Sequence, residues 1–372
     1  MISGLEGWRR VAGRLSRRTQ NRSVSALQPP HRRTVSQLAL LLAFASLTAA
    51  ACGEGSTSTS NSIRQYNDTW LWNGADWTEA HSAISPSPRT APALAYDEAT
   101  HQLVLFGGRS TTGDLSFFDD TWTWDGDAWT QQHPAHSPGG RDEAGLVYDA
   151  KLRALILIGG FVQKSQADSS TFLGGLRDVW MWDGSDWNEV GSTPVPLTLY
   201  ISDKAAFDPE SKEVVAIGDL ETTSWDGSAW SQVPNPKNWF GVDVTYVDPT
   251  TRRLTALVAF ANPDNSLTYR LESWQAGAWD DGPVVALPVV MDQGWLDVAA
   301  ATYDSKRKRV VIFGGGCMDH PGNQTLLFDG TGWSVAEPAD VPPGRTYAYM
   351  AFDSDRAETV MFGGSTSGAV LC

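Results

Sequence analysis

The sequence predicts an all-β fold, a closed ring of six blades with four short antiparallel strands in each, and three observations support this prediction. A two-part unit recurs six times with a period of about 40–60 residues, which is typical of a propeller. Each unit contains alternating, β-branched and aromatic segments separated by Gly-rich turns. The chain also begins with one part of the unit and ends with the other.

The first part of the unit is an aromatic strand that ends in a turn and a Trp. Clear copies are residues 70–77, 122–129 and 180–187, and weaker copies end at Trp230, Trp279 and Trp333. In every copy except the one that ends at Trp279, the turn contains Asn-Gly or Asp-Gly, which favours a two-residue hairpin. This register predicts that Trp122 lies opposite Trp129, and by the same count that Trp70 faces Trp77 and Trp180 faces Trp187.

The second part runs from an aromatic-Asp pair to a Gly-Gly pair. Clear copies are residues 96–108, 148–160, 303–315 and 352–364, and degenerate copies begin at Phe207-Asp208 and Val247-Asp248. An apolar strand precedes the aromatic, and a β-branched strand such as 102–106 or 309–313 precedes the Gly-Gly pair, where a backbone without Cβ can turn tightly. The Asp repeats with the unit, which indicates a role in the turn and not in catalysis.

The order of the parts predicts how the ring closes. A Trp hairpin at 67–77 has no aromatic-Asp part before it, and an aromatic-Asp part at 345–364 has no Trp hairpin after it. We therefore expect the N-terminal strands to supply the outer half of the last blade and the C-terminal strands its inner half, which removes open sheet edges. The predicted propeller spans residues 67–372.

The Trp residues admit two interpretations. Each can bury about 150–250 Å² between neighbouring blades. The alternative is a platform on which carbohydrate stacks. The regular recurrence of Trp with the blade favours the first interpretation, a core between blades.

These residues resemble the kelch-repeat family, which includes the propeller domain of galactose oxidase. The resemblance is carried by the apolar strand, the Gly-Gly pair, a variable loop and a Trp at fixed spacing, over residues 67–364. It implies the fold but no particular activity. A copper centre of the oxidase type needs an adjacent Tyr-His pair, which this sequence lacks, so oxidase activity is not expected.

The first 51 residues are interpreted as a secretory signal. Residues 1–35 carry eight Arg and one Glu, and an apolar run at 38–51 follows. The segment before Cys52 resembles a bacterial lipobox, which implies that Cys52 is lipidated and begins the mature chain. A flexible polar tether, 52–66, comes next. We expect an exported protein, either lipid-anchored at the bacterial cell envelope or secreted, whose only membrane contact is the lipid anchor.

Charge excludes one class of partner. The chain has 28 Lys and Arg against 43 Asp and Glu, and without residues 1–51 the counts are 20 against 42, a net charge of −22. So acidic a domain repels nucleic acid, and nucleic-acid binding is excluded.

Two Cys remain if Cys52 carries lipid. Cys317 and Cys372 both follow Gly-Gly ends in adjacent blades. An exported protein favours a disulfide between them, and a metal or redox role for Cys317 is the alternative.

Recognition is expected on one face of the ring. The long, irregular loops 109–118, 161–176, 261–268 and 316–324 follow the second strand of a blade and emerge on the same face, and variable loops on a rigid scaffold commonly bind ligands.

Three Arg lie seven residues before the aromatic in contiguous units and are the candidate ligand-binding residues: Arg89, Arg141 and Arg345. Their planar forks suit carboxylates or phosphates. The alternative is that each Arg bonds to a neighbouring Asp or to backbone.

Enzymatic function is not predicted. The sequence contains no nucleophile elbow, phosphate-binding Gly loop or HExxH motif, and its His residues, such as His133, His136 and His320, form no convincing metal set. No cofactor, metal or catalytic residue is assigned. The sequence favours a monomeric, non-enzymatic cell-surface module that binds a protein or peptide through the long-loop face, and the three Arg suit an acidic partner. The alternative is an envelope carbohydrate-binding or carbohydrate-active protein, with stacking groups Phe117, Phe118, Phe172 and Trp295.

Overall fold

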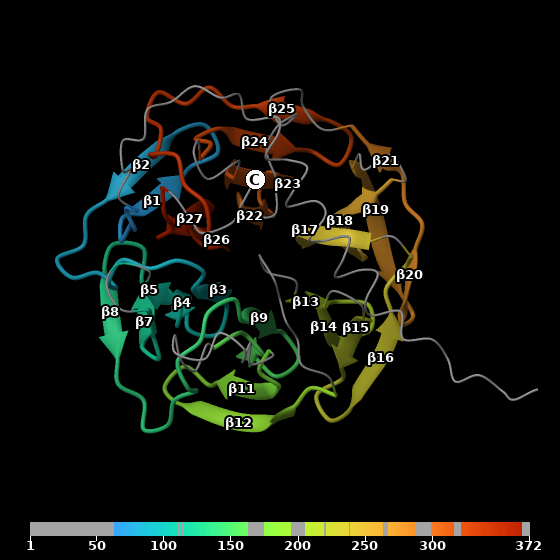
Figure 1. The fold of residues 1–372 in the computed structure, drawn as a ribbon, viewed down its shortest axis with the longest axis horizontal. Helices are drawn as coiled ribbons and strands as arrows, with labels where there is room; N and C mark the ends of the chain where they lie inside the picture. Colours follow the sequence, from blue (N-terminus) through green and yellow to red (C-terminus); the bar gives the residue numbers. More distant parts are fainter. Residues whose placement is uncertain are drawn as a thin grey trace, which may run out of the picture. The chain divides into compact units, whose positions relative to one another are not determined.

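The computed structural model describes residues 63–110, 112, 115–162, 175–194, 205–218, 221–237, 239–262, 267–286, 299–315 and 321–366. All of them lie in one compact unit, Gly55–Cys372. Six antiparallel sheets, each with a path of four strands, surround a central axis, and the described residues contain no helix (Figure 1). The predicted six-bladed β-propeller is confirmed.

The blades are numbered here in chain order. The strands of each blade are given from the innermost to the outermost. Blade 1 contains β3 (Ala93–Asp97), β4 (Gln102–Phe106), β7 (Thr121–Trp124) and β8 (Trp129–Gln132), and blade 2 contains β9 (Gly145–Asp149), β10 (Ala154–Ile158), β11 (Asp178–Trp182) and β12 (Trp187–Ser192). Blade 3 contains β13 (Ala205–Asp208), β14 (Glu213–Ile217), β15 (Glu221–Trp225) and β16 (Trp230–Pro234). Blade 4 contains β17 (Trp239–Val247), β18 (Leu254–Ala261), β19 (Leu267–Gln275) and β20 (Ala278–Asp280), with β21 (Val284–Val285) also paired to β19.

Blade 5 contains β22 (Ala299–Asp304), β23 (Arg309–Gly314), β24 (Thr325–Phe328) and β25 (Trp333–Val335). Blade 6 joins the two ends of the described chain: its inner strands are β26 (Tyr349–Asp353) and β27 (Glu358–Phe362), and its outer strands are β1 (Thr69–Trp72) and β2 (Trp77–Ala80). A separate two-stranded hairpin is formed by β5 (Arg109–Ser110) and β6 (Ser116–Phe117).

The ring closes in blade 6 as the order of the sequence parts predicts. Strand β1 pairs antiparallel with β27, so that Thr69 lies opposite Phe362 and Trp72 opposite Thr359. The pairing continues beyond the strands, because the Tyr66 N–H donates to the Gly364 carbonyl at 2.9 Å. The closure therefore pairs the edges of β1 and β27, which would otherwise be open.

The predicted register of the Trp hairpins is wrong by two residues. Trp124 lies opposite Trp129, and Trp122 lies opposite Gln131. The reason is a four-residue turn, in which the Asp125 carboxylate accepts the backbone N–H groups of Asp127 and Ala128, each at 2.9 Å. The Asp of the Asp-Gly pair thus forms an Asx turn through its carboxylate, and the pair does not form a two-residue hairpin. Trp72 with Trp77 and Trp182 with Trp187 follow the same register.

The paired Trp residues form the core between blades, which confirms their structural interpretation. The side chains of Trp129 and Trp187 are 1% and 0% exposed. Trp187 packs edge-on against Phe106 of blade 1, with ring centroids 5.2 Å apart, and its Nε1–H donates to Thr121 Oγ1 of blade 1 at 2.9 Å. Residues this deeply buried cannot serve as a platform for carbohydrate.

This packing predicts the effect of removing one indole N–H. We expect Trp187→Phe to lower the free energy of unfolding by about 1–3 kcal/mol, because the ring is smaller and the buried Thr121 hydroxyl loses its donor. Urea unfolding measures this change. Adding Thr121→Val should cost little more, since both substitutions remove the same hydrogen bond. Fully additive losses in the double variant would contradict the coupling between blades 1 and 2.

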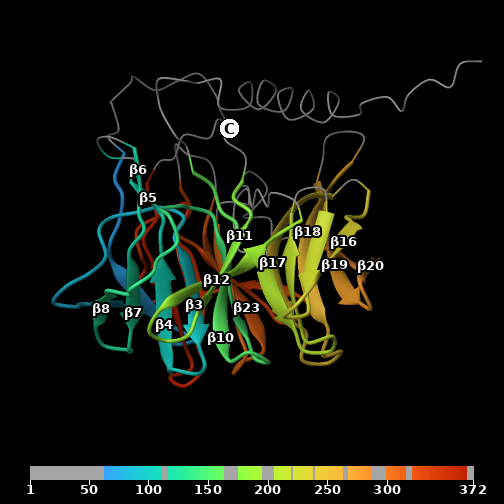
Figure 2. The ribbon, with the colours of Figure 1, turned by 90° about the horizontal axis from the view of Figure 1, so that it is seen from below.

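The two faces of the ring differ in their loops (Figure 2). The short-loop face, as defined here, carries the turns between the first and second and between the third and fourth strands of each blade. The long-loop face carries the other connections, and the β5–β6 hairpin stands on it, at the rim of blade 1. Among the described residues, no helix is long and apolar enough to cross a membrane.

Candidate functional site at the long-loop mouth of the channel

A central channel runs between the innermost strands of all six blades. Its cavity volume is about 330 Å³. Small side chains such as Ala95, Ala206 and Ala301 line it, and aromatic rings gather where the inner strands end on the short-loop face: Tyr96, Tyr148, Phe207, Tyr246, Tyr303 and Phe352. The channel is therefore wide enough for a small group but mostly apolar along its length.

Tyr246 and Tyr303 form the tightest aromatic pair of this channel end. Their rings stack with centroids 5.2 Å apart at 23°. Burial, followed by the nearby charges of Asp248 and Asp304, raises the pKa of Tyr303 to about 12. Both hydroxyls are buried and have no hydrogen-bond partner among the described residues. Both therefore stay protonated and can donate a hydrogen bond.

Arg89, Arg141 and Arg345 are part of the scaffold, which corrects the expectation of three guanidiniums available at the channel mouth. These three residues are 0%, 2% and 1% exposed, respectively. Arg89 forms a bidentate pair with Asp120, with Nη1–Oδ1 2.6 Å and Nη2–Oδ2 2.9 Å, and its Nη1 also donates to the Gly107 carbonyl at 2.8 Å. Arg141 does the same with Asp178, and Arg345 with Asp68.

Each of these Asp residues has a second partner that completes a repeated Arg–Asp–Trp unit. The Trp122 indole N–H donates to Asp120 at 2.7 Å, and the Phe118 ring lies 4.0 Å from the Arg89 guanidinium carbon. Burial raises the pKa of Asp120, but the hydrogen bonds and charge of Arg89 together with Trp122 hold it below its ordinary value. The Arg charge is thus neutralised, and its fork is fully occupied within the blade.

The short-loop face repeats one turn six times. The Asp that ends each inner strand accepts backbone N–H groups from the turn that follows, as Asp149 does from Lys151 at 2.8 Å and Leu152 at 3.0 Å. The turn role expected for these Asp residues is confirmed. The turns also connect neighbouring blades, since Lys151 Nζ donates to the Asp226 carbonyl of blade 3 at 2.6 Å.

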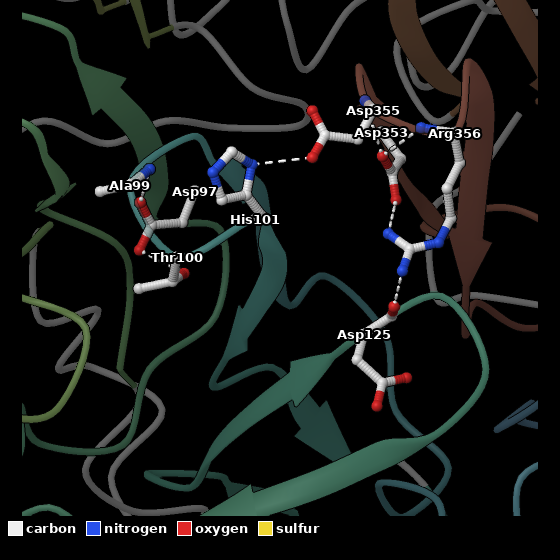
Figure 3. A network of polar contacts seen from close by, with 8 residues as sticks. All are labelled: Asp97, Ala99, Thr100, His101, Asp125, Asp353, Asp355 and Arg356. Carbon is white, nitrogen blue, oxygen red and sulfur yellow. Dashed lines mark hydrogen bonds and ion pairs between the residues drawn. The ribbon is translucent and has the colours of Figure 1, made fainter.

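Figure 3 shows this network where blade 6 meets blade 1. Arg356 pairs with Asp353 at 3.0 Å and also donates to the backbone carbonyl of Asp125 in blade 1. His101 Nδ1 lies 2.7 Å from Asp355, with side chains 65% and 49% exposed. These groups bond to each other across the seam, and solvent screens the exposed pair, so the network fits a structural role.

The long-loop mouth contains a different and unrepeated pair of charges. Arg109 begins β5, immediately after the Gly-Gly pair of blade 1, and its Nη1 lies 3.0 Å from Asp142 Oδ2 of blade 2. The Arg109 side chain is 26% exposed and that of Asp142 is 0% exposed. The guanidinium carbon also lies 5.9 Å from the ring centroid of Tyr347, which lines the channel in blade 6. Arg109 therefore spans three neighbouring blades.

The backbone beneath this pair is strained at three equivalent positions. Ala91, Glu143 and Tyr347 have φ values of 51°, 52° and 57°. Backbone hydrogen bonds join them into a row, from Ala91 N to the Tyr347 carbonyl at 3.1 Å and from Glu143 N to the Ala91 carbonyl at 3.0 Å. Left-handed backbone at residues other than Gly costs free energy and concentrates at functional sites.

Asp142 has an unusual pKa for a carboxyl. Burial, followed by the charge of Glu143, raises it from 3.8 to about 8, although Arg109 opposes the shift. In blades 1 and 6 the equivalent residues are Thr90 and Thr346, which form the equivalent isolated bridges. The repeat therefore does not require a carboxyl here, and a perturbed, buried acid next to a charged partner marks a candidate functional site.

Sequence reasoning missed Arg109 and Asp142, although a signal was present. The residue after the repeated Arg is Thr90 in one unit, Thr346 in another and Asp142 in the third, so that only the third is acidic. The residue after the Gly-Gly pair is charged only at Arg109, among the pairs at 107–108, 159–160 and 363–364. The equivalent residues Phe161 and Ser365 are uncharged. A position-by-position comparison of the repeat units therefore identifies Arg109 and Asp142 as the residues that differ from their equivalents.

Several predicted residues lie outside the described part of the chain: Cys52, Cys317, Cys372, His320, Phe172 and Trp295. Of the expected stacking groups that are described, Phe118 lies against Arg89, and Phe117 packs edge-on with Phe161 at 6.4 Å. Both side chains are partly buried. Within the described ranges, no group of three or more His, Cys, Asp or Glu is placed to hold a metal ion.

Comparison with known proteins supports the architecture. The propeller is similar to a solved structure titled "Structure of YjhT", with a TM-score of 0.51 and 15% sequence identity over 75% of this chain and 96% of that chain. This likeness shows the fold alone. No family model matches the sequence, and no curated protein matches it. The function must therefore be argued from the site.

Proposed function

We propose that this protein is an exported, non-enzymatic binding module of the kelch type that recognises a protein or peptide through its long-loop face. The observation that carries the proposal is the contrast between the faces. The short-loop face repeats one Asp-capped turn, whereas the long-loop face carries the β5–β6 hairpin on blade 1 and the unrepeated Arg109–Asp142 pair. Departures from a repeat on one face are typical of a recognition surface.

The proposed location follows from the N-terminal sequence. A basic segment, an apolar run and Cys52 suit export and lipid attachment at the bacterial envelope, with secretion as the alternative. The polar segment that begins at Cys52 would let the propeller reach a partner in the same envelope. The predicted tether, 52–66, is too long at its end, because Gln65 and Tyr66 are buried and pair with blade 6. Proteolytic release or metabolic labelling with a fatty-acid analogue, compared with Cys52→Ser, distinguishes the two locations.

The binding proposal is tested by blocking one face at a time. Ser116→Arg adds a long side chain at an exposed position of β6 on the long-loop face, and Ala229→Arg does so at an exposed turn on the short-loop face. We expect affinity capture from envelope extract to retain a partner with the native protein and with Ala229→Arg, and to lose it with Ser116→Arg. Loss with Ala229→Arg alone would place recognition on the opposite face and contradict the proposal.

Carbohydrate binding is the second candidate, and the channel aromatics favour it. The stacked Tyr246 and Tyr303 rings line the central channel, and a sugar group that enters the channel would pair with their buried hydroxyls, which have no partner among the described residues. A glycan panel read by melting temperature, with Tyr303→Phe as the variant, tests this candidate. Stabilisation by a glycan that Tyr303→Phe abolishes would support it over peptide binding.

A further inference from the structure

The charge of Arg109 at the long-loop mouth is not balanced in the way that the charges of Arg89, Arg141 and Arg345 are. Asp120 accepts two hydrogen bonds from Arg89, and the pairs of Arg141 and Arg345 are equally complete. Arg109 has a single contact with a carboxylate, through Nη1. Its Nε–H has no hydrogen-bond partner among the described residues. This guanidinium therefore keeps one donor, the buried Nε–H, that the described scaffold does not use.

The partner of Arg109 does not fully neutralise it either. Because burial raises the pKa of Asp142 to about 8, the carboxyl is largely protonated at neutral pH. The charged or titratable groups near it are Arg109 from β5, Glu143 in its own segment and Tyr347 across the mouth. Arg109 thus contributes a local positive charge on a domain whose net charge without residues 1–51 is −22.

We propose that Arg109, held between Asp142 and Tyr347 at the long-loop mouth of the channel, binds a carboxylate group of the partner. This inference rests on the proposed function and specifies its ligand chemistry. A planar carboxylate matches the guanidinium fork. The Tyr347 ring, 5.9 Å from the guanidinium carbon, gives an apolar surface for the carbon chain that carries the carboxylate.

The surroundings select a monoanion over a phosphate group. A single Arg already shares Nη1 with Asp142, and Glu143 adds negative charge within the same segment. A doubly charged phosphate would meet this repulsion at a single guanidinium. An Asp or Glu side chain or a peptide C-terminus carries the single charge that the site can balance.

The test uses a pair of small probes that differ in one group. N-acetyl-glutamate amide carries one carboxylate, and N-acetyl-glutamine amide is its neutral analogue. At about pH 6.5, where Asp142 is protonated, we expect the first probe to shift the NMR signals of the Arg109 guanidinium in a saturable way and the second to leave them unchanged. Arg109→Gln should abolish binding, read from the backbone amide signals of neighbouring residues, and Arg177→Gln should not, because the exposed Arg177 donates to the backbone carbonyls of Thr193 and Pro194.

The pH dependence separates this site from a simple surface charge. Binding to the native protein should weaken above about pH 8, as Asp142 ionises and competes for Arg109. In Asp142→Thr the weakening should disappear. Equal response to both probes, binding that survives in Arg109→Gln, or a stronger response to inorganic phosphate would each overturn the inference.

The outcome is distinguishable from failure of the proposed function. In one outcome the native protein captures a partner, Ser116→Arg loses it, and Arg109 does not respond to the carboxylate probe. This outcome rejects the carboxylate ligand and retains the long-loop face as the binding surface. In the other outcome Arg109 responds to the carboxylate probe, but Ser116→Arg loses no partner. This outcome rejects recognition of a protein partner through the long-loop face and retains Arg109 as a site for a small carboxylate. Peptides ending in a free carboxylate or an amide then identify whether a side chain or a chain terminus is bound.

Discussion

Asp142→Thr is expected to stabilise the protein at about pH 8 and to leave its stability at about pH 4 nearly unchanged. In the unfolded chain this carboxyl ionises near 3.8, whereas in the folded protein it ionises near 8. Because the folded pKa is raised, the unfolded state loses its proton first, and stability falls as pH rises from about 4 to about 8. Thr removes the titrating group, and Thr90 and Thr346 already occupy the equivalent positions.

The expected gain is on the order of 2 kcal/mol at pH 8, less than the full pKa difference implies, because Arg109 also loses its ion pair. Urea unfolding of the native protein and Asp142→Thr across this pH range measures it. Arg109→Gln is the matched control, and it should lower stability most at high pH, where Asp142 ionises without a partner. Parallel pH profiles for native protein and Asp142→Thr would contradict the raised pKa.

Asp142 also shows what the sequence can predict about the site. The repeat identified the Arg at positions 89, 141 and 345, and the structure places all three in the same Arg–Asp–Trp unit. A residue that recurs in equivalent units meets a shared structural need, which in blades 1, 2 and 6 is to neutralise a partly buried Asp and to fix the segment before the first strand. Sequence recurrence therefore indicated scaffold, and the candidate site lies where one copy departs from the others.

The fold was predictable for the same reason. Spacing alone determines which segments share a blade, and the unmatched parts at 67–77 and 345–364 predict that β1 pairs with β27, as observed. The hairpin register was not predictable from Asp-Gly alone. A two-residue turn and a four-residue turn both accommodate Gly126, and only the bonds from Asp125 to the amides of Asp127 and Ala128 select the second.

The closure of the ring predicts the second large effect. Arg345→Met and Arg89→Met should each lower the free energy of unfolding by about 3–5 kcal/mol, because each leaves a partly buried Asp without its partner. The local contacts match: Arg345 bonds Asp68 at 2.6 and 2.8 Å and the Gly363 carbonyl at 2.9 Å, and it lies 4.1 Å from the Tyr66 ring centroid. The two substitutions therefore remove nearly identical interactions.

The two variants should nevertheless differ in how the structure opens. Asp120 and Arg89 lie within one continuous blade, whereas Asp68 and Arg345 join the first strands of the described chain to its last. Losing the second pair weakens a contact that no short connection restores, so β1 and β2 can separate from β27 while the other blades remain folded. We expect hydrogen exchange to show early loss of protection in β1 and β2 for Arg345→Met and not for Arg89→Met. Equal protection in the two variants would mean that the strand pairing of blade 6 holds the ring closed without this ion pair.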